Sequence, residues 1–307
     1  MATMQKIPLR IFYRKIEELI IDQQTDSAIS HAQYLLEEYP KNISVYKLLG
    51  KAFLEKQEFD YANTVFEKIL LVEPDDFVSH IGISIIAESF GNLEKSLESM
   101  RRAYELEPSN ESLQTEVKRL HESKDGFAPD QVRLTRGALI NMYSRSQLTE
   151  QAIAEARLGI QESPNRIDYK VHLANMLFHS GMNNKAIEIC LDIISILPYC
   201  KPALVILYKL ITPLGKINDS TVYKTRVGES DPYFSFIKPD TESVDDIPDI
   251  AIMIEEIKKP NNTLGNFNDF IEEAWKETTR RNDLSSSAEQ IEDWTSIIED
   301  AVSNNGI

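Results

Sequence analysis

Residues 41–74 read KNISVYKLLGKAFLEKQEFDYANTVFEKILLVEP, and this stretch decides the fold. Tyr46, Leu49 and Phe53 recur at i, i+3 and i+7, the spacing of one face of an amphipathic helix. A second apolar-periodic stretch follows and ends at Pro74, because proline lacks a backbone donor and disfavours helical geometry in the residue before it. The stretch therefore predicts two consecutive helices closed by a proline.

Small and aromatic residues in the same stretch indicate how the two helices pack. Gly50 and Ala62 carry little or no side chain, so the helices of one hairpin can approach closely there. Phe66, one turn after Ala62, is expected to fill the space between one hairpin and the next. Asp75 and Asp76 then offer N-caps for the following helix. The pattern predicts a helical hairpin that must stack on a neighbour.

Proline positions indicate that the hairpin repeats along the chain. Pro40, Pro74 and Pro108 are evenly spaced, and the same spacing separates Pro164 from Pro198. The order aromatic-x2-Leu-Gly-x2-aromatic, Ala-x3-Phe and Pro resembles the tetratricopeptide repeat (TPR), a helix–turn–helix unit of about 34 residues.

The resemblance implies an all-α, right-handed TPR α-solenoid in residues 1–212, with about five helical hairpins and a capping helix. In general form it resembles bacterial TPR proteins of unassigned role. An irregular insertion is expected at residues 111–132, because the interval from Pro108 to Pro164 is longer than one repeat and shorter than two. One added helix is predicted there from three apolar residues on one face: Leu113, Val117 and Leu120.

The last repeat is expected to be incomplete. A sixth first-helix begins after Pro198, and Pro213 and Gly215 are expected to stop it before a partner helix forms. This lone helix would cap the stack. Residues 213–249 are rich in Asp, Ser, Thr, Pro and Gly, and are predicted to be mostly extended or disordered.

Residues 213–307 are predicted to be an acidic tail. Positions 229–307 hold 19 acids and 6 bases, whereas positions 1–228 hold 30 acids and 27 bases. Short amphipathic helices in the tail must pack on something, because such helices are rarely stable alone in water. Two interpretations stay open: they complete this chain's own core, or they recognise another protein. The predicted helices lie near 250–258, 267–280 and 288–302, and the residues expected to act in recognition are Phe270, Trp275, Ile291, Trp294 and Ile298.

Composition and motifs limit the function classes. Cys190 and Cys200 make neither a disulfide framework nor a zinc site. The histidines lack metal-ligand spacing, and no phosphate loop or nucleophile motif occurs, so we expect no enzyme, no catalytic or metal-binding residue and no cofactor. The net charge of −16 argues against nucleic-acid binding. Without an apolar span or a signal-peptide core, we expect a cytoplasmic protein that does not bind membranes.

The TPR resemblance also implies a binding surface, the concave groove lined by the first helix of each hairpin. Lys, Arg and Asn on such a surface would hold a carboxylate or an acidic peptide. The Lys–Asn pair with which some TPR proteins clamp a C-terminal carboxylate is missing, since Lys47 is followed one turn later by Lys51. The residues predicted to line the groove are Lys47, Lys51, Ile81, Ile85, Asn141, Arg145, Asn175, His179 and Lys209.

The sequence therefore predicts a non-enzymatic adaptor or scaffold that binds a protein or peptide ligand, acidic in character, in the concave groove. The charge asymmetry adds the hypothesis that part of the acidic tail folds back as an intramolecular competitor. An alternative is a subunit of a larger assembly that docks through the Trp-containing tail helices. A third interpretation, a regulator of an enzyme or an unrecognised hydrolase, requires a convergent polar pocket that the linear sequence does not reveal.

Overall fold

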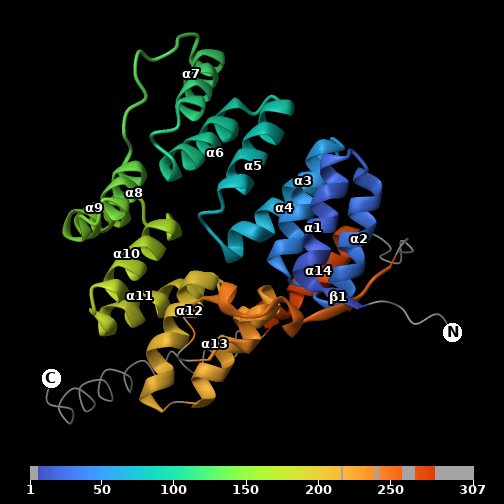
Figure 1. The fold of residues 1–307 in the computed structure, drawn as a ribbon. Coiled ribbons are helices and arrows are strands. Elements are labelled where there is room, and N and C mark those ends of the chain that lie inside the picture. Colours follow the sequence, from blue (N-terminus) through green and yellow to red (C-terminus); the bar gives the residue numbers. More distant parts are fainter. Residues whose placement is uncertain (1–5, 216, 239–240, 242, 258–266, 281–307) are drawn as a thin grey trace, which may run out of the picture. The chain divides into compact units, whose positions relative to one another are not determined.

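The computed structural model describes residues 6–215, 217–238, 241, 243–257 and 267–280 (Figure 1). By their contacts the residues form two units, 1–263 and 264–307. The described part of the first unit is almost entirely helical, and its helices follow one another as hairpins. The fold is TPR-like, as predicted.

Six hairpins stack in chain order in the described part of the first unit, and each contacts the next. One extra helix, α7 (Glu111–Asp125), follows the third hairpin. The hairpins are α1 (Leu9–Ile21) with α2 (Thr25–Glu38), α3 (Ile43–Glu55) with α4 (Phe59–Val72), α5 (Phe77–Ser89) with α6 (Leu93–Leu106), α8 (Arg136–Arg145) with α9 (Thr149–Glu162), α10 (Ile167–His179) with α11 (Asn183–Ile196), and α12 (Lys201–Ile211) with α13 (Ile217–Ser230).

A residue with positive φ lies in the turn between the two helices of each hairpin. Glycine adopts this left-handed backbone without steric cost, whereas glutamine does so at a penalty. The turn residues recur with the period of the prolines within two runs, on either side of the α7 insertion. The first run is Gln23, Gln57 and Gly91, and the second is Gln147, Gly181 and Gly215.

The interface between the second and third hairpins is built around the ring of Phe66. This side chain is fully buried. A Cβ atom added at Gly50 would lie 2.5 Å from Phe66 Cε1, and one added at Gly82 would lie 2.3 Å from Cε2. The ring therefore lies between two helices that can approach it only because they carry glycine at these points. This is the role that the sequence predicts for Gly50 and Phe66.

The insertion forms a helix, α7, as predicted, and Leu113, Val117 and Leu120 are buried on its inner face. It does not separate the stack into two parts, because α6 contacts both α7 and α8. Gly137 at the start of α8 lies against the side chain of Glu105 on α6, where an added Cβ would be 2.4 Å from Oε2. The third and fourth hairpins are thus in direct contact.

The sixth hairpin corrects the prediction of a lone capping helix. Pro213 and Gly215 do not end the repeat, because Gly215 takes the left-handed turn that Gly181 takes one period earlier. Helix α13 then packs on α12, with Tyr223 and Val227 buried. The structure therefore has a complete hairpin where the sequence predicted a boundary at residue 212.

Residues after α13 also differ from the expected extended tail. The 3-10 segments η2 (Pro232–Phe236), η3 (Val244–Asp246) and η4 (Asp249–Ala251) follow α13. The helix predicted near 250–258 is wrong, because strand β2 (Met253–Glu255) pairs antiparallel with β1 (Lys6–Pro8) at the other end of the chain. Side chains alternate there: Ile252 and Ile254 are buried, and Met253 and Glu255 are exposed. That period of two belongs to a strand.

The second unit contains α14 (Phe267–Arg280) among its described residues, where the sequence predicts a helix near 267–280. The helix predicted near 288–302 lies outside the described residues. No helix in the described ranges has the length and apolar character needed to cross a membrane.

Candidate functional site

The predicted groove residues lie on the first helices of their hairpins, and four of them contact a neighbouring element. Lys47 Nζ on α3 lies 2.6 Å from Glu73 Oε2, and Lys51 Nζ lies 3.2 Å from a Glu17 carboxylate oxygen. On α8, Asn141 donates to the Glu105 carbonyl at 3.0 Å, and Arg145 donates to the Leu106 carbonyl at 2.8 Å. Lys51, Asn141 and Arg145 therefore connect adjacent hairpins. The Lys47–Glu73 pair lies within the second hairpin, and Lys47 reaches the third hairpin through Asp76 at 2.5 Å. On α5, Ile81 packs against the core beside α6 and α7, and Ile85 is exposed.

The other three predicted residues come together in one cavity. Asn175 and His179 on α10 and Lys209 on α12 line a cavity of about 360 Å³. Its remaining walls are Glu73, at the end of α4, and five residues of α10 and α12. Those five residues are Phe178, Lys201, Pro202, Val205 and Ile206.

The linker between α4 and α5 crosses from the second hairpin to the fifth and sixth. Glu73 carries an ion pair to Lys201 on α12 at 3.5 Å, and Asp75 pairs with His172 on α10 at 3.3 Å. Asp76 instead caps α5 by accepting from the Ser79 amide at 2.9 Å. Hairpins three or four places apart in the stack are thus joined by polar contacts.

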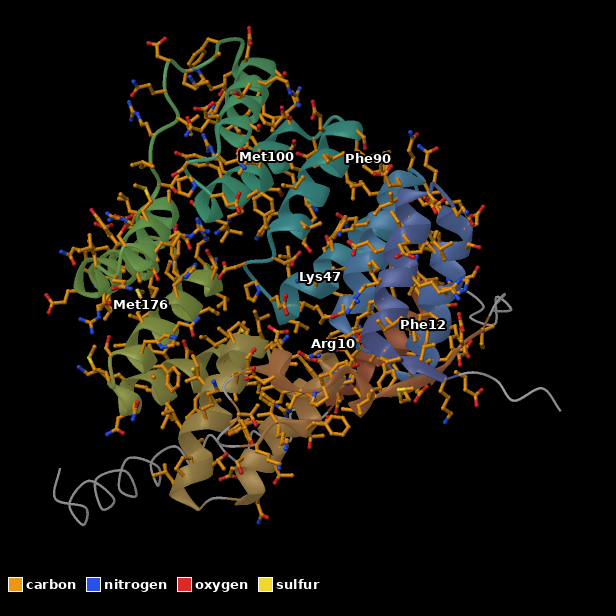
Figure 2. All side chains as sticks on the ribbon, in the orientation of Figure 1. Arg10, Phe12, Lys47, Phe90, Met100 and Met176 are labelled. Carbon is orange, nitrogen blue, oxygen red and sulfur yellow. The ribbon has the colours of Figure 1, made fainter. Side chains whose placement is uncertain are left out.

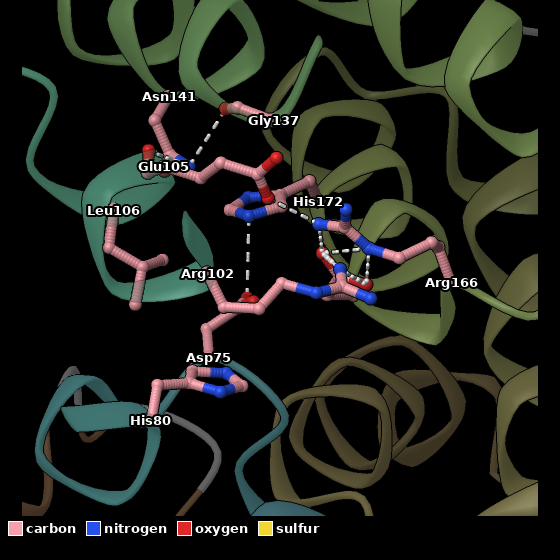
Figure 3. Close-up of a pocket in the computed structure, with 10 residues that line it drawn as sticks. Asp75, His80, Arg102, Glu105, Leu106, Gly137, Asn141, Arg166 and His172 are labelled. Atoms are coloured by element: carbon pink, nitrogen blue, oxygen red, sulfur yellow. Dashed lines mark hydrogen bonds and ion pairs between the residues drawn. The ribbon is translucent and has the colours of Figure 1, made fainter. Parts of the chain in front are cut away.

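A polar cluster lies where this linker approaches α6 and α10 (Figure 3). Arg166 donates to carboxylate oxygens of Glu105 and Asp168, each at 2.5 Å, and Arg102 on α6 lies 3.3 Å from Asp168. Burial raises the pKa of Glu105 to about 8. Burial also raises the pKa of Asp75 to about 6, and the charge of His172 opposes that rise. The space left among these residues is about 10 Å³, room for one water molecule at most, so the cluster fills the interior and leaves no ligand pocket.

A second set of polar contacts joins the sixth hairpin to the first two. Lys41, in the linker before α3, donates to the hydroxyl of Tyr199 and to Glu229 on α13, both at 2.7 Å. Lys201 on α12 pairs with Asp231, just after α13, at 3.0 Å, and reaches the second hairpin through Glu73 at 3.5 Å. We call these residues, Lys41, Tyr199, Lys201, Glu229 and Asp231, the polar seam.

The acidic stretch of residues 243–257 lies on the first hairpin, and Figure 2 shows Arg10 of α1 beside it. Arg10 donates to the carbonyls of Ile247 at 2.7 Å and Val244 at 2.8 Å, and pairs with Asp249 at 2.9 Å. Its guanidinium stacks 4.0 Å from the centroid of the Tyr233 ring. The same stretch is held further along by three contacts: the Leu9 amide to the Ile252 carbonyl at 3.0 Å, Lys15 to Glu256 at 3.1 Å, and His31 Nε2 to the Ile257 carbonyl at 3.2 Å.

Sequence reasoning missed Arg10, Lys15 and Lys41 as partners of acids that follow position 228. The cations that bind the tail were expected in the groove, because the faces of the helices were assigned from the repeat alone. One signal in the sequence could have indicated these contacts: Ile252 and Ile254 alternate with other residues. This alternation favours a strand, and a strand needs a second strand elsewhere in the chain to pair with.

Of the residues predicted for tail recognition, Phe270 and Trp275 lie on α14 of the second unit. Ile291, Trp294 and Ile298 lie outside the described residues. Docking of a larger assembly through these helices stays a prediction.

The described residues contain no group of three or more His, Cys, Asp or Glu arranged to hold a metal ion. Cys190 and Cys200 are buried thiols, and burial raises the pKa of Cys200 to about 12, which keeps it in the unreactive protonated form. The polar cluster does bring acids, arginines and histidines together, as the hydrolase interpretation required. Its carboxylates are paired with arginine and histidine partners, and the cluster lacks space for a substrate.

No family model and no curated protein matches the sequence. Among solved structures it is similar to PilF of Pseudomonas aeruginosa, with 12% identity, a TM-score of 0.30, and coverage of 73% of this chain and 91% of that one. The TPR domain of P58(IPK) shares 12% identity at a TM-score of 0.34, over 89% of this chain and 66% of that one. YrrB, described as a TPR protein with an unusual peptide-binding site, shares 16% identity at a TM-score of 0.31, over 63% and 88%.

These likenesses are distant, so we take the TPR-like fold from the chain's own geometry. Its hairpins repeat with one constant period in two runs, and a left-handed turn residue lies in register in each hairpin. By fold, the chain is an α-solenoid of TPR-like hairpins.

Proposed function

We propose that this chain is a non-enzymatic scaffold that binds acidic segments of other proteins, and that its own residues 243–257 occupy part of the binding surface. The observation that carries the proposal is the contact of Arg10 with two backbone carbonyls and one carboxylate of that stretch. One cation thus contacts both backbone carbonyls and an acidic side chain of the same stretch.

The mode of recognition is strand addition combined with charge pairing. β1 supplies backbone donors and acceptors to β2, and the Leu9 amide adds a further bond to the Ile252 carbonyl. Main-chain bonds of this kind give affinity that does not depend on the bound sequence, while pockets for alternate side chains give specificity. Here the alternate side chains are Ile252 and Ile254, which are buried. A partner would need β-branched residues at alternate positions and acids facing α1.

The cis segment competes with any such partner at high effective concentration. A segment tethered to the same chain reaches the millimolar range, so a separate peptide binds only weakly until the cis contact is weakened. We therefore propose that the acidic tail blocks the surface of the scaffold to which a partner would bind. The groove cations Lys47, Lys51 and Arg145 are proposed as further contact points for the same partner.

The test uses a labelled peptide of residues 243–257 and fluorescence anisotropy. It is titrated into the wild-type chain, a full-length double variant Asp249→Lys/Ile252→Asp, and the matched control Glu150→Lys, which changes an acid on α9, far along the chain from α1. We expect the peptide to bind the double variant at least tenfold more tightly than the other two, since only there is the cis segment weakened.

A further substitution tests whether the peptide binds at Arg10. Arg10→Ala, added to the double variant, should abolish the gain, because it removes the cation that contacts both the backbone and the acid. Equal peptide binding by the wild type, the double variant and the control, or binding that survives Arg10→Ala unchanged, would overturn the proposed surface.

A further inference from the structure

A short aromatic segment after α13 packs on the sixth hairpin. In η2 and the residue that follows it, three side chains are almost fully buried: Tyr233, Phe234 and Ile237. The ring of Phe234 meets that of Tyr208 on α12 edge-on, with 5.5 Å between the ring centroids. Lys224 on α13 donates to the Ile237 carbonyl at 2.6 Å. Apolar and polar contacts therefore hold this segment against both helices of the sixth hairpin.

The same segment reaches the first hairpin through Tyr233. The guanidinium of Arg10 on α1 lies 4.0 Å from the centroid of the Tyr233 ring, and the Tyr233 hydroxyl donates to the Asp249 carbonyl at 3.0 Å. Residues 243–257, which include Asp249, pair with β1 and contact α1. We call residues 232–237 and 243–257 together the strap, and Figure 1 shows it in orange between α13 and β1. The strap joins the last hairpin of the array to the first.

The two ends of the array make few other contacts within the described residues. No described helix of the first two hairpins packs extensively against α12 or α13. The direct links are polar, namely the polar seam and the ion pair of Glu73 with Lys201 at 3.5 Å. Partly exposed ion pairs contribute little to stability, whereas buried aromatic side chains dominate the energetics of interfaces. The polar seam thus sets which side chains meet, and the strap supplies the apolar contact between the ends.

Contacts between the ends are additional to those that the repeat supplies, because each repeat of a solenoid contacts only its neighbours. We propose that the strap holds the hairpin array closed, and that displacement of residues 243–257 by a partner lets the first and sixth hairpins move apart. The closure rests on the contacts above, and only the event that releases it rests on the proposed function. A bound partner differs from the strap because it has no covalent connection to α13, so it fills the surface beside Arg10 without closing the array.

The experiment measures the distance between two spin labels on the full-length chain by electron paramagnetic resonance. The labels are attached at two exposed positions, through Ser27→Cys on α2 and Thr225→Cys on α13. The native thiols, Cys190 and Cys200, are buried and do not take up the label in the folded chain. The distance between the labels therefore reports how far the first hairpin lies from the sixth.

Phe234→Ala loosens the strap where it contacts α12, and Phe236→Ala is the matched control, since Phe236 is an exposed aromatic residue of the same segment. We expect Phe234→Ala to shift the distance distribution to longer values and the control to keep that of the wild type. Circular dichroism should be the same in all three chains.

The double variant Asp249→Lys/Ile252→Asp loosens the other end of the strap, and it should lengthen the distance as well. A saturating concentration of the 243–257 peptide is then added to this variant. The peptide occupies the surface beside Arg10 but is not joined to α13, so we expect the long distance to persist with the peptide bound.

Two results would overturn the closing role of the strap. One is a wild-type distance in either strap variant with circular dichroism unchanged, and the other is a return to the wild-type distance when the peptide binds. The proposed function fails separately, because it is read from the anisotropy of the peptide. Tight peptide binding with unchanged distances dismisses the strap alone, whereas longer distances without peptide binding dismiss the proposed function and support closure by the strap.

Discussion

Two interfaces in the first unit hold hairpins together by different means. Between the second and third hairpins, the buried ring of Phe66 lies between Gly50 and Gly82, and contact is apolar. Between the sixth hairpin and the first two, the polar seam joins Lys41 to Tyr199 and Glu229 through hydrogen bonds and an ion pair. The first interface connects neighbours in the stack, whereas the second connects hairpins that lie far apart along the chain.

The difference shows what the repeat does and does not encode. Apolar stacking recurs with the period of the repeat, because every hairpin must bury a face against the next. Polar contacts between distant hairpins follow no period, and each requires both partners to be present at unrelated positions. We therefore expect apolar stacking to supply most of the stability and the polar seam to fix how distant hairpins meet.

The largest effect is expected from Phe66→Ala. Removing a fully buried ring leaves a cavity between the second and third hairpins, which should lower the free energy of unfolding by about 3–5 kcal/mol. Urea denaturation followed by circular dichroism measures the change. Phe127→Ala, at an exposed loop position, is the matched control and should change it by less than about 0.5 kcal/mol. A similar loss in both variants would contradict an interface centred on Phe66.

Gly82→Ala should act on the same interface from the other side. The new Cβ would lie 2.3 Å from the Phe66 ring, and the ring has little room to shift because Gly50 lies against it as well. We expect a loss of about 1–3 kcal/mol from overpacking. In a double-mutant cycle with Phe66→Leu, the two losses should be less than additive, since the smaller side chain makes room for the methyl group. If the two losses were fully additive, the methyl group added at position 82 would not clash with the Phe66 ring.

The polar seam is tested by Lys41→Met, which keeps the approximate length of the side chain and removes its charge. The change leaves Glu229 and the Tyr199 hydroxyl without this donor, and we expect a loss of about 1–2 kcal/mol. Hydrogen exchange should rise in α13 and in the linker before α3, and stay unchanged around Phe66. Lys56→Met removes a more exposed ion pair and should cost at most about 1 kcal/mol, with no change in α13. Unchanged exchange in α13 would show that the seam does not hold the sixth hairpin.

The two interfaces also differ in how far they could be predicted. The spacing of Tyr46, Gly50 and Phe66 was enough to predict the hairpins and the close approach at Gly50, because those contacts are local or one period away. The sixth hairpin could have been predicted from Gly215, which keeps the register of Gly181, but the neighbouring Pro213 was given more weight. The Lys41–Glu229 contact could not have been predicted, since no rule of periodicity links two positions so distant in the sequence.

The same reasoning explains the mixed outcome at the candidate sites. Asn175, His179 and Lys209 were placed on one surface because they share a face of successive first helices, and the structure brings them into one cavity. Arg10 was not considered, because its partners belong to a stretch that the sequence analysis assigned to a mostly extended tail. Face assignment from a repeat thus groups residues that lie close together within the stack, and it misses contacts formed with segments outside the stack.

The smallest effect, and the finest test of the cross-stack contacts, is the pH dependence of Asp75. Its folded-state pKa is raised by burial to about 6, from 3.8. A raised carboxyl pKa means that the folded state favours the proton, so this contribution to stability is full below about pH 4 and is lost as pH rises through about 6. Asp75→Asn should remove that loss. Relative to wild type, the free energy of unfolding of the variant should rise by about 1 kcal/mol between pH 4 and pH 7. This is less than the full pKa shift would give, because the side chain is partly exposed and His172 lies 3.3 Å away.

The control for this titration is Asp60→Asn, at an exposed position on α4, which should follow the wild-type pH curve. Urea denaturation at each pH measures the difference between the three chains. Parallel curves for Asp75→Asn and wild type would mean that the linker carboxylate stays hydrated in the folded chain. Burial of Asp75 would then carry no pH-dependent cost, and the polar contact between the second and fifth hairpins would not weaken as the pH rises from 4 to 7.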